Sequence, residues 1–426
     1  MDLATVVDLL WVIVSGILVF FMQAGFTLLE AGFTSKKNTA NIAMKNIVDL
    51  FIGGIAFWAV GYSLMYGNSI SGFIGRLTIF YIEPTDMHNL FFQTVFCATA
   101  VTIISGAIAE RAKFSTYVIF AFLFTTFIYP IAGHWIWQSD GWLTQMGFID
   151  FAGSTAVHVM GGFAALVYAF ILGARHDKYN ADGTVNPKQG HNNLFAVLGV
   201  FILWMGWFGF NAGSTLAITG ESASAVPLII LNTNLAAAAG GIMALFITWI
   251  KYKKADIAMT LNGTLAGLVG VTAGCSVVDP AGALAIGGIA GVLVTLMAEI
   301  VEKKFKIDDA VSSFSVHGIA GMVGTILVGL FATEGGLLYG GGFEQIKVQT
   351  IGALSVAVWS VAVTFIVVSI LKYTVGIRVP LEHEIVGLDD TEHNIEFDNN
   401  SINKEEILKT TTSPKVAEEQ STTATA

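Results

Sequence analysis

Two histidines, His158 and His317, lie in otherwise apolar stretches and are the side chains best placed for chemistry. Each ends the pattern D-x3-S-x2-V-H, which begins at Asp150 and again at Asp309. A neutral imidazole both donates and accepts a hydrogen bond. Two such rings can therefore bind each other and a small polar solute, and they can pass a proton between them.

A metal site is the other common use of two imidazoles. It would need a third ligand at a similar depth, and the sequence offers none with a clear spacing. We therefore predict neither a metal nor a cofactor. The neighbouring residues are valine, methionine and isoleucine, so a bare cation would face a large desolvation penalty there. A small molecule that sheds its charge, or a relayed proton, would not.

The elements that position these histidines are predicted to be membrane spans. Of the 426 residues, 54% are apolar and 12% are charged, which is about half the charged share of a soluble domain. So few charges cannot cover a water-exposed surface, so the composition predicts an all-α polytopic membrane protein. The net charge of −10 argues against a nucleic-acid partner. Two cysteines in apolar stretches give no disulfide framework.

Eleven segments are long and apolar enough to cross a lipid bilayer, for which about 20 residues are needed. They cover residues 9–31, 47–66, 90–109, 114–134, 151–173, 194–213, 227–250, 257–276, 281–301, 311–332 and 350–375. The first lacks the features of a cleaved signal peptide, so we expect it to be retained. Of the 21 Lys and Arg, all but Arg76 and Lys347 fall on one side. The positive-inside rule then places the N-terminus outside and the C-terminus in the cytoplasm.

The two histidine patterns lie five spans apart. Because five is odd, their helices should run in opposite directions, which is the signature of an inverted 5+5 repeat plus one helix. The halves cover about 1–175 and 190–335, and the added helix covers about 350–375. Each histidine lies about 12 Å along its helix, so the rings should meet near the middle of the membrane. A lone histidine there joins two helices by a hydrogen bond about as often as it has a function. Two at symmetry-related positions favour a function, because ionisable groups in membrane spans usually mark a path for ions or protons.

Aromatic residues gather at the predicted outer ends of several spans. Phe92 and Phe96 begin the third span, Trp137 ends the fourth, and Phe210 and Ser214 close the sixth. Such residues commonly form an interfacial belt. The mix of large rings, glycine and a closing hydroxyl also suits a cup for a small cation, since each ring face attracts a cation by about 0.5–2 kcal/mol. Stacked phenylalanines below such a cup would form a dry constriction.

Together these residues resemble the ammonium transporter (Amt/Mep/Rh) family over nearly the whole chain. The matching segments are 22–26 (MQAGF), 92–96 (FQTVF), 106–111 (GAIAER), 150–153 (DFAG), 207–213 (WFGFNAG), 387–389 (GLD) and the two histidine patterns. The resemblance implies a homotrimer of eleven-helix protomers in the cell membrane, each with its own pore.

The resemblance also implies roles for residues at matching positions. These are Phe96, Trp137 and Ser214 at an outer ammonium site, Phe96 and Phe210 at a gate, His158, His317 and Trp207 in the pore, and Asp150 and Phe92 in support. Asp150 resembles the family's essential acid. At a helix N-terminus the dipole favours its negative charge, so we expect Asp150 to shape and polarise the outer site rather than touch ammonium. Asp309 resembles the same device on the cytoplasmic side.

Three other ionisable residues near the predicted cytoplasmic ends are expected to be structural or to anchor loops. They are Glu30, Glu110 and Arg111.

The implied function is transport of ammonium, which is recruited at the outer site and deprotonated near the gate. Ammonia then passes the histidine pair, and the sequence leaves open whether the proton follows. An ammonium sensor with the same site is the alternative, although no signalling domain is fused to the chain. A sodium-coupled transporter would call for paired Gly/Pro helix breaks, and an enzyme for a nucleophile, a metal site or a polar cleft. None is evident, so we predict no enzymatic activity.

The chain changes character after the transmembrane domain, which is predicted over 1–378. Residues 379–398 include EHEIVGLDD at 382–390, which resembles the family's cytoplasmic segment that packs under the pores. The family is commonly blocked by a trimeric PII-type signalling protein that inserts loops from the cytoplasm, so we expect such a partner. Asn394 stands where the family pattern has glycine. Residues 399–426 are polar and predicted to be disordered.

Overall fold

The computed structural model describes residues 1–80 and 86–395, so the predicted disordered tail lies outside the described residues. The first half contains α1 (Leu3–Phe33), η1 (Lys36–Asn38), α2 (Thr39–Ile52), η2 (Gly53–Gly61), α3 (Tyr62–Tyr66), β1 (Ser69–Ile70), β2 (Ile74–Gly75), α4 (Met87–Ala107), α5 (Phe114–Leu123), η4 (Phe124–Ile128), α6 (Tyr129–Trp137), α7 (Trp142–Gln145), η5 (Ser154–Val159) and α8 (Met160–Leu172). The second half contains α9 (Asn193–Gly213), α10 (Ser222–Tyr252), α11 (Ile257–Val271), α12 (Pro280–Lys303), η6 (Phe314–Ile319), α13 (Ala320–Phe331), η7 (Leu337–Tyr339), α14 (Glu344–Thr374), α15 (Leu381–Val386) and α16 (Leu388–His393).

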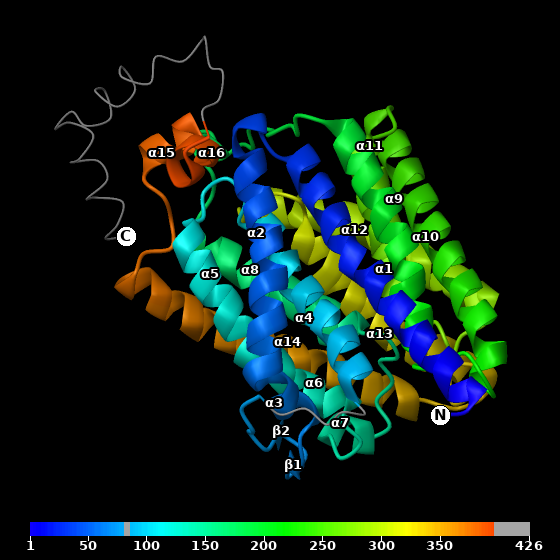
Figure 1. The fold of residues 1–426 in the computed structure, drawn as a ribbon. Helices are drawn as coiled ribbons and strands as arrows, with labels where there is room; N and C mark the ends of the chain where they lie inside the picture. The colour runs from blue at the N-terminus through cyan, green and yellow to red at the C-terminus, as the bar shows by residue number, and fades with distance from the viewer. Residues whose placement is uncertain (81–85, 396–426) are drawn as a thin grey trace.

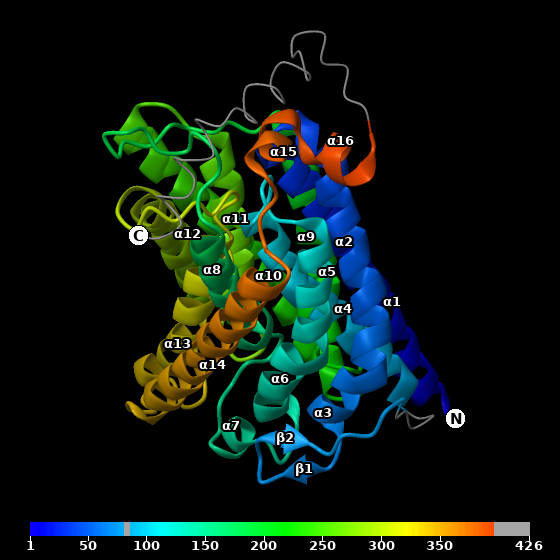
Figure 2. The ribbon, with the colours of Figure 1, turned by 90° about the vertical axis from the view of Figure 1, so that its left-hand side faces the viewer.

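These helices form a bundle of tilted rods, with the N-terminus at one end and α15 and α16 at the other (Figures 1 and 2). In the described ranges, 10 of the eleven predicted spans are helical segments long and apolar enough to cross a membrane. The all-α polytopic fold is therefore confirmed. The count of eleven spans and the orientation of the chain stay predictions.

The eighth predicted span is shorter than expected. Its helix, α11, covers only 15 residues, about 22 Å at 1.5 Å per residue, and does not continue to residue 276. The cause lies in the residues that follow it. The carbonyl oxygens of Thr272 and Ala273 accept hydrogen bonds from the backbone N–H groups of Ala152 and Phe151. The chain leaves the helix there and anchors the segment that precedes η5.

The two histidine-bearing spans cross as an antiparallel pair. Each begins with one π-helical turn, η5 or η6, and continues as α8 or α13. The first turn η5 packs against α13, and η6 packs against α8, so the start of each span lies beside the end of the other. The two spans therefore run in opposite directions, as the inverted repeat predicts. The sequence did not predict the π-helical turns, which recur at functional sites in other helices.

Glycines allow the two spans to approach each other closely. A Cβ atom at Gly162 would lie 2.2 Å from the backbone nitrogen of Gly318, and one at Gly321 would lie 2.6 Å from the carbonyl oxygen of Ser154. Gly162 and Gly321 each follow a histidine by four residues. The absence of a side chain at these positions therefore brings the two backbones, and with them the two histidines, together.

Gly162→Ala should destabilise this crossing. Because the new methyl group would meet backbone atoms, which cannot rotate away, we expect a loss of about 1–3 kcal/mol. The melting temperature (Tm) of the purified protein in detergent, followed by tryptophan fluorescence, measures it. Gly54→Ala is the matched control, since a Cβ there would meet nothing within 4 Å, and its Tm should be unchanged or higher. Equal Tm values for the two variants would contradict the packing argument.

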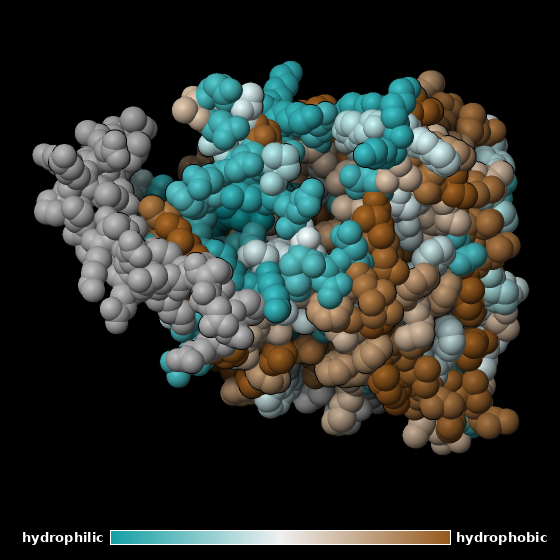
Figure 3. Space-filling view, turned by 90° about the horizontal axis from the view of Figure 1, so that it is seen from above, coloured by the Kyte–Doolittle hydropathy of each residue, from teal (hydrophilic) through white to brown (hydrophobic). Residues whose placement is uncertain are grey.

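The short tail helices are fixed to the end of the bundle seen in Figure 3, where hydrophilic residues gather over the middle of the face and apolar residues along its flank. The carboxylate of Asp389 accepts hydrogen bonds from the N–H groups of Ala40 and Asn41, at 3.1 and 2.8 Å, and so caps α2. Lys37 Nζ donates to the carbonyl oxygen of Ile385 at 2.6 Å. Asn394 ends α16 with φ of 55°, a left-handed conformation that asparagine tolerates nearly as glycine does.

Candidate functional site

Four of the predicted site residues line one cavity of about 150 Å³, namely Phe92, Phe96, Trp137 and Ser214. The rings of Phe96 and Trp137 meet edge to face, with 6.1 Å between their centroids and 76° between their planes. Ser214 Oγ donates to the carbonyl oxygen of Phe210 at 2.8 Å, which leaves its own lone pairs for the cavity. Ring faces and one hydroxyl oxygen thus surround a space suited to a small cation.

Three polar residues that the sequence reasoning missed also line this cavity, namely Tyr66, Asn89 and Gln93. The side-chain oxygens of Asn89 and Gln93 are buried and have no hydrogen-bond partner in the described part of the chain. These two residues precede Phe96 by seven and three positions, so they share its face of α4. Helical spacing from Phe96 identifies both positions, whereas the pattern of aromatic residues alone does not.

Two stacked rings close the inner end of this cavity. The centroids of Phe96 and Phe210 lie 3.9 Å apart, with 16° between the ring planes. Both side chains are buried, and Phe210 lies 5.7 Å from His158 on its other side. The two rings therefore lie in sequence between Trp137, which lines the cavity, and His158.

The two histidines touch, as the repeat predicts. Their Nδ1 atoms lie 3.1 Å apart, and the ring planes differ by 19°. Since one nitrogen must donate and the other accept, the neutral pair shares one N–H between the rings. His158 also stacks on Trp207 at 5.1 Å, and Trp207 Nε1 donates to Thr272 Oγ1 at 2.9 Å. Within residues 1–80 and 86–395, His158 Nε2 has no hydrogen-bond partner, so it can serve a solute.

Asp150 is not among the residues that line the outer cavity. Its carboxylate accepts hydrogen bonds from three backbone N–H groups within 153–156, at 2.8 to 3.0 Å, at the start of η5. Its carbonyl oxygen accepts from Trp137 Nε1 at 2.8 Å. Asp309 caps η6 in the same way, through two N–H groups of 313–314 at 2.9 and 2.8 Å. The two acids therefore hold the turns that carry the histidines.

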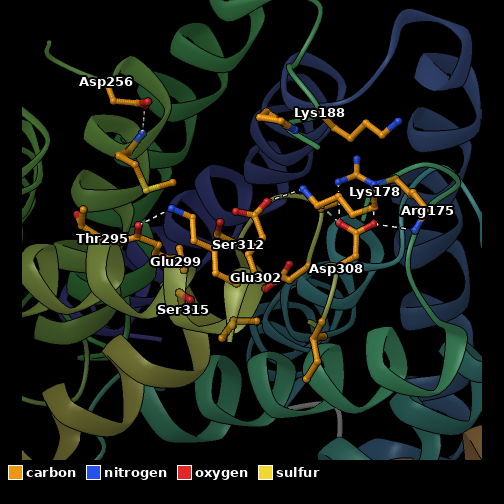
Figure 4. Close-up of a pocket in the computed structure, with 18 of the residues that line it drawn as sticks. Arg175, Lys178, Lys188, Asp256, Thr295, Glu299, Glu302, Asp308, Ser312 and Ser315 are labelled. Atoms are coloured by element: carbon orange, nitrogen blue, oxygen red, sulfur yellow. Dashed lines mark hydrogen bonds and ion pairs between the residues drawn. The ribbon is translucent and has the colours of Figure 1, made fainter. Parts of the chain in front are cut away.

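A buried ionic cluster ties together the loops at the opposite end of the pore. Arg175 donates through Nε and Nη2 to the two carboxylate oxygens of Asp308, both at 2.8 Å (Figure 4). Through Nη1 it donates to Glu110. Burial alone would raise the pKa of Glu110, but the charge of Arg175 and its hydrogen bonds lower that pKa to about 2. Arg111 donates to the carbonyl oxygens of Gly173 and Asp308. Glu110 and Arg111 thus have the loop-anchoring contacts expected of them.

In the described ranges, no three His, Cys, Asp or Glu side chains gather so that they could hold a metal ion.

Residues 10–397 match the model of the Ammonium Transporter Family. The ammonium transporter Amt2 of Archaeoglobus fulgidus is 46% identical over an alignment of 414 residues, and the match covers 91% of this chain and 87% of that protein. A putative ammonium transporter of Synechocystis is 40% identical over 396 residues, with 90% and 87% covered.

Solved structures of Amt and Mep2 proteins also resemble this chain. A sensor Amt protein superimposes with a TM-score of 0.87 at 40% identity and covers 92% of this chain and 99% of its own. Mep2 of Saccharomyces cerevisiae superimposes with a TM-score of 0.80 at 28% identity, with 89% and 88% covered. With the family model matched across nearly the whole chain, the chain belongs to the ammonium transporter family and is a multi-pass membrane protein.

Proposed function

We propose that this chain carries ammonium across the cell membrane by moving it past the histidine pair as ammonia. Ammonium is held by Phe96, Trp137 and Ser214, where ring faces and a hydroxyl oxygen replace its water. It loses its proton near the stacked rings of Phe96 and Phe210, since a bare cation would face a large desolvation penalty beyond them. Ammonia then passes His158 and His317, whose nitrogens replace the hydrogen bonds of water.

One observation carries this proposal: an unbroken row of rings leads from the cavity to the pair. Successive centroids are 6.1, 3.9, 5.7 and 5.2 Å apart along Trp137, Phe96, Phe210, His158 and His317. The row begins with ring faces that favour a cation and ends with nitrogens that favour a small polar molecule. This order matches the removal of charge during transport.

Uptake of labelled methylammonium by proteoliposomes tests the proposal. We expect uptake above that of protein-free liposomes, and excess unlabelled ammonium should suppress it. Folded protein that takes up no methylammonium would contradict transport.

Removal of either ring of the pair should reduce uptake. His158→Ala and His317→Ala each leave the remaining Nδ1 atom buried without its partner, which costs about 1–3 kcal/mol. If the free-energy barrier to transport rises by about the same amount, uptake falls by about 10-fold to 100-fold. Size-exclusion chromatography shows whether each variant is folded, and the proteoliposome assay gives its rate. Wild-type uptake and selectivity in either variant would remove the pair from the mechanism.

An ammonium sensor is the second candidate, and the 40% identity and TM-score of 0.87 to a sensor Amt protein favour it. A sensor would bind ammonium at the same outer site without conducting it. Calorimetry in detergent would then detect binding, while the proteoliposomes would show no uptake.

We infer three further properties from the family resemblance. The protomers assemble as a homotrimer with one pore each, the chain is not an enzyme, and a PII-type protein binds from the cytoplasm. The contacts of Asp389 with the start of α2 support a regulatory role for residues 379–398, since they link this segment to a transmembrane helix. Light scattering on the purified protein tests the trimer, and co-purification with a PII protein tests the partner.

A further inference from the structure

A second, smaller cavity lies on the other side of the histidine pair from the stacked phenylalanines. It has a volume of about 10 Å³ and is lined by His317, Phe26, Glu30, Asn262 and Val311, among others. Such a volume holds about one water molecule. Because His317 Nδ1 is occupied by His158, Nε2 is the ring nitrogen that His317 has left for this cavity.

Residues of the neighbouring helices α2 and α4 hold Glu30 in place. A Cβ atom at Gly106 would lie 3.3 Å from Cγ and Cδ of Glu30, so the glycine of α4 makes room for the carboxylate. Glu30 Oε2 accepts hydrogen bonds from Ser105 Oγ at 3.0 Å and from Asn46 Nδ2 at 3.3 Å. Glu30 is therefore a positioned acid in the same cavity as His317, rather than only a link between loops.

A buried cluster of charges surrounds Glu30. Lys45 Nζ donates to the carbonyl oxygen of Ser105 at 2.9 Å. The carboxylate of Asp49 accepts from Tyr117 OH at 2.8 Å and from Thr102 Oγ1 at 2.9 Å. Glu30, Lys45 and Asp49 are exposed by 2%, 1% and 0%. Of these three residues only Glu30 lines the cavity, so Glu30 is the carboxylate of the cluster that can take up a proton from His317.

Asn262 gives an independent sign that the cavity receives a ligand or a proton donor. It is exposed by only 2%, and its side-chain Oδ1 atom has no hydrogen-bond partner in the described part of the chain. An unpaired buried acceptor costs about 1–3 kcal/mol. A group that enters the cavity with an N–H or O–H bond would satisfy it.

The cavity also leads toward the end of the bundle that carries α15 and α16. Asn262 and Val311 line both this cavity and a wider pocket of about 460 Å³. That pocket shares Asp256 and Ser312 with the charged pocket of about 440 Å³ that Figure 4 shows. In Figure 4, Lys178 is bound to Glu302 along its wall and Lys188 lies nearby. A proton on Glu30 would therefore be one side chain away from a polar, open basin.

From this geometry we propose that Glu30 receives the proton that ammonium gives up and passes it to the cytoplasmic basin. The inference rests on the proposed function. The N–H bond at His317 Nε2 of the protonated pair breaks as an O–H bond forms on Glu30, directly or through one water molecule. The imidazole becomes neutral, and the carboxylate becomes a carboxylic acid. The acid then releases its proton to water in the basin and returns to its starting state.

Glu30→Gln tests this relay, because the amide keeps the size of the side chain but cannot take up the proton. Ammonium-evoked current on a solid-supported membrane and methylammonium uptake are measured on the same proteoliposomes. We expect the charge moved per methylammonium to fall by about tenfold or more. Glu30→Asp, which keeps a carboxylate, should restore part of the current. Asp49→Asn is the matched control, since it removes a buried charge of the same cluster that does not line the cavity. Its ratio of charge to uptake should equal that of wild type.

The outcomes separate the relay from transport itself. An unchanged ratio in Glu30→Gln, or an equal fall in Asp49→Asn, would overturn the relay. Wild-type uptake without any current would also overturn it and leave transport intact, whereas no wild-type uptake would overturn the proposed function. If Glu30→Gln does not fold, Asn262→Leu removes the unpaired acceptor of the same cavity. That variant should also lower the ratio, and an unchanged ratio would count against the relay.

Discussion

Asp150→Ala should reduce methylammonium uptake about a hundredfold, which corresponds to roughly 2.7 kcal/mol on the barrier. The carboxylate holds three backbone N–H groups at the start of η5, the turn that carries His158. Hydrogen bonds to a charged acceptor contribute about 1.5–3 kcal/mol each. Alanine removes all three, so the turn can move away from the geometry that pairs His158 with His317. The negative charge near the helix N-terminus is lost as well.

We expect this loss of uptake because Asp150 caps the turn that carries His158, and not because it caps a helix. Asp279→Ala is the matched control, because Asp279 caps α12 through the N–H group of Gly282 at 2.7 Å and lines none of the cavities along the pore. We expect it to keep uptake within about twofold of wild type, a change of roughly 0.4 kcal/mol. Asp150→Asn, whose amide oxygen can replace only some of the acceptor sites, should be intermediate. Equal uptake in Asp150→Ala and Asp279→Ala would show that Asp150 is an ordinary cap.

The histidine pair could be predicted because its information is local and repeated. The same nine-residue pattern occurs twice, and the copies lie an odd number of spans apart, so their helices must run in opposite directions. Contact between His158 and His317 follows from the equal depth of the two rings. The glycines that follow each histidine were visible in the same pattern, and the structure shows that they set the distance between the two backbones.

Other features depend on residues that are distant in sequence, and no local pattern predicts them. Arg175 meets Glu110 and Asp308, which are 65 and 133 residues away. The early end of α11 depends on carbonyl groups that bond to the segment before η5. The sequence predicts only a structural role for Glu30, and only the fold places it in a cavity with His317. Periodicity states which face of a helix a residue occupies, but it does not state which helix lies opposite.

Arg175→Ala should lower the free energy of unfolding by about 3–5 kcal/mol, because it removes the guanidinium that pairs with two buried carboxylates. The side chains of Arg175 and Asp308 are exposed by 6% and 1%, so water cannot replace the lost contacts. Thermal unfolding in detergent, followed by tryptophan fluorescence, measures the effect. Lys347→Ala is the matched control, since it removes an exposed ion pair with Glu344, and such pairs contribute about 0–1 kcal/mol. Equal Tm shifts in the two variants would contradict the argument.

The dependence of this loss on pH identifies its cause. The pKa of Glu110 is about 2 in the folded protein, below its ordinary value of 4.5, so the unfolded chain binds the proton more tightly. The stabilisation that Glu110 gains from Arg175 is therefore complete above pH 4.5 and is lost as the pH falls toward 2. Since Arg175→Ala removes the charge that lowers this pKa, the Tm difference between wild type and variant should shrink over the same pH range. A difference that stays constant there would mean that Arg175 stabilises the loops by packing and not by its charge.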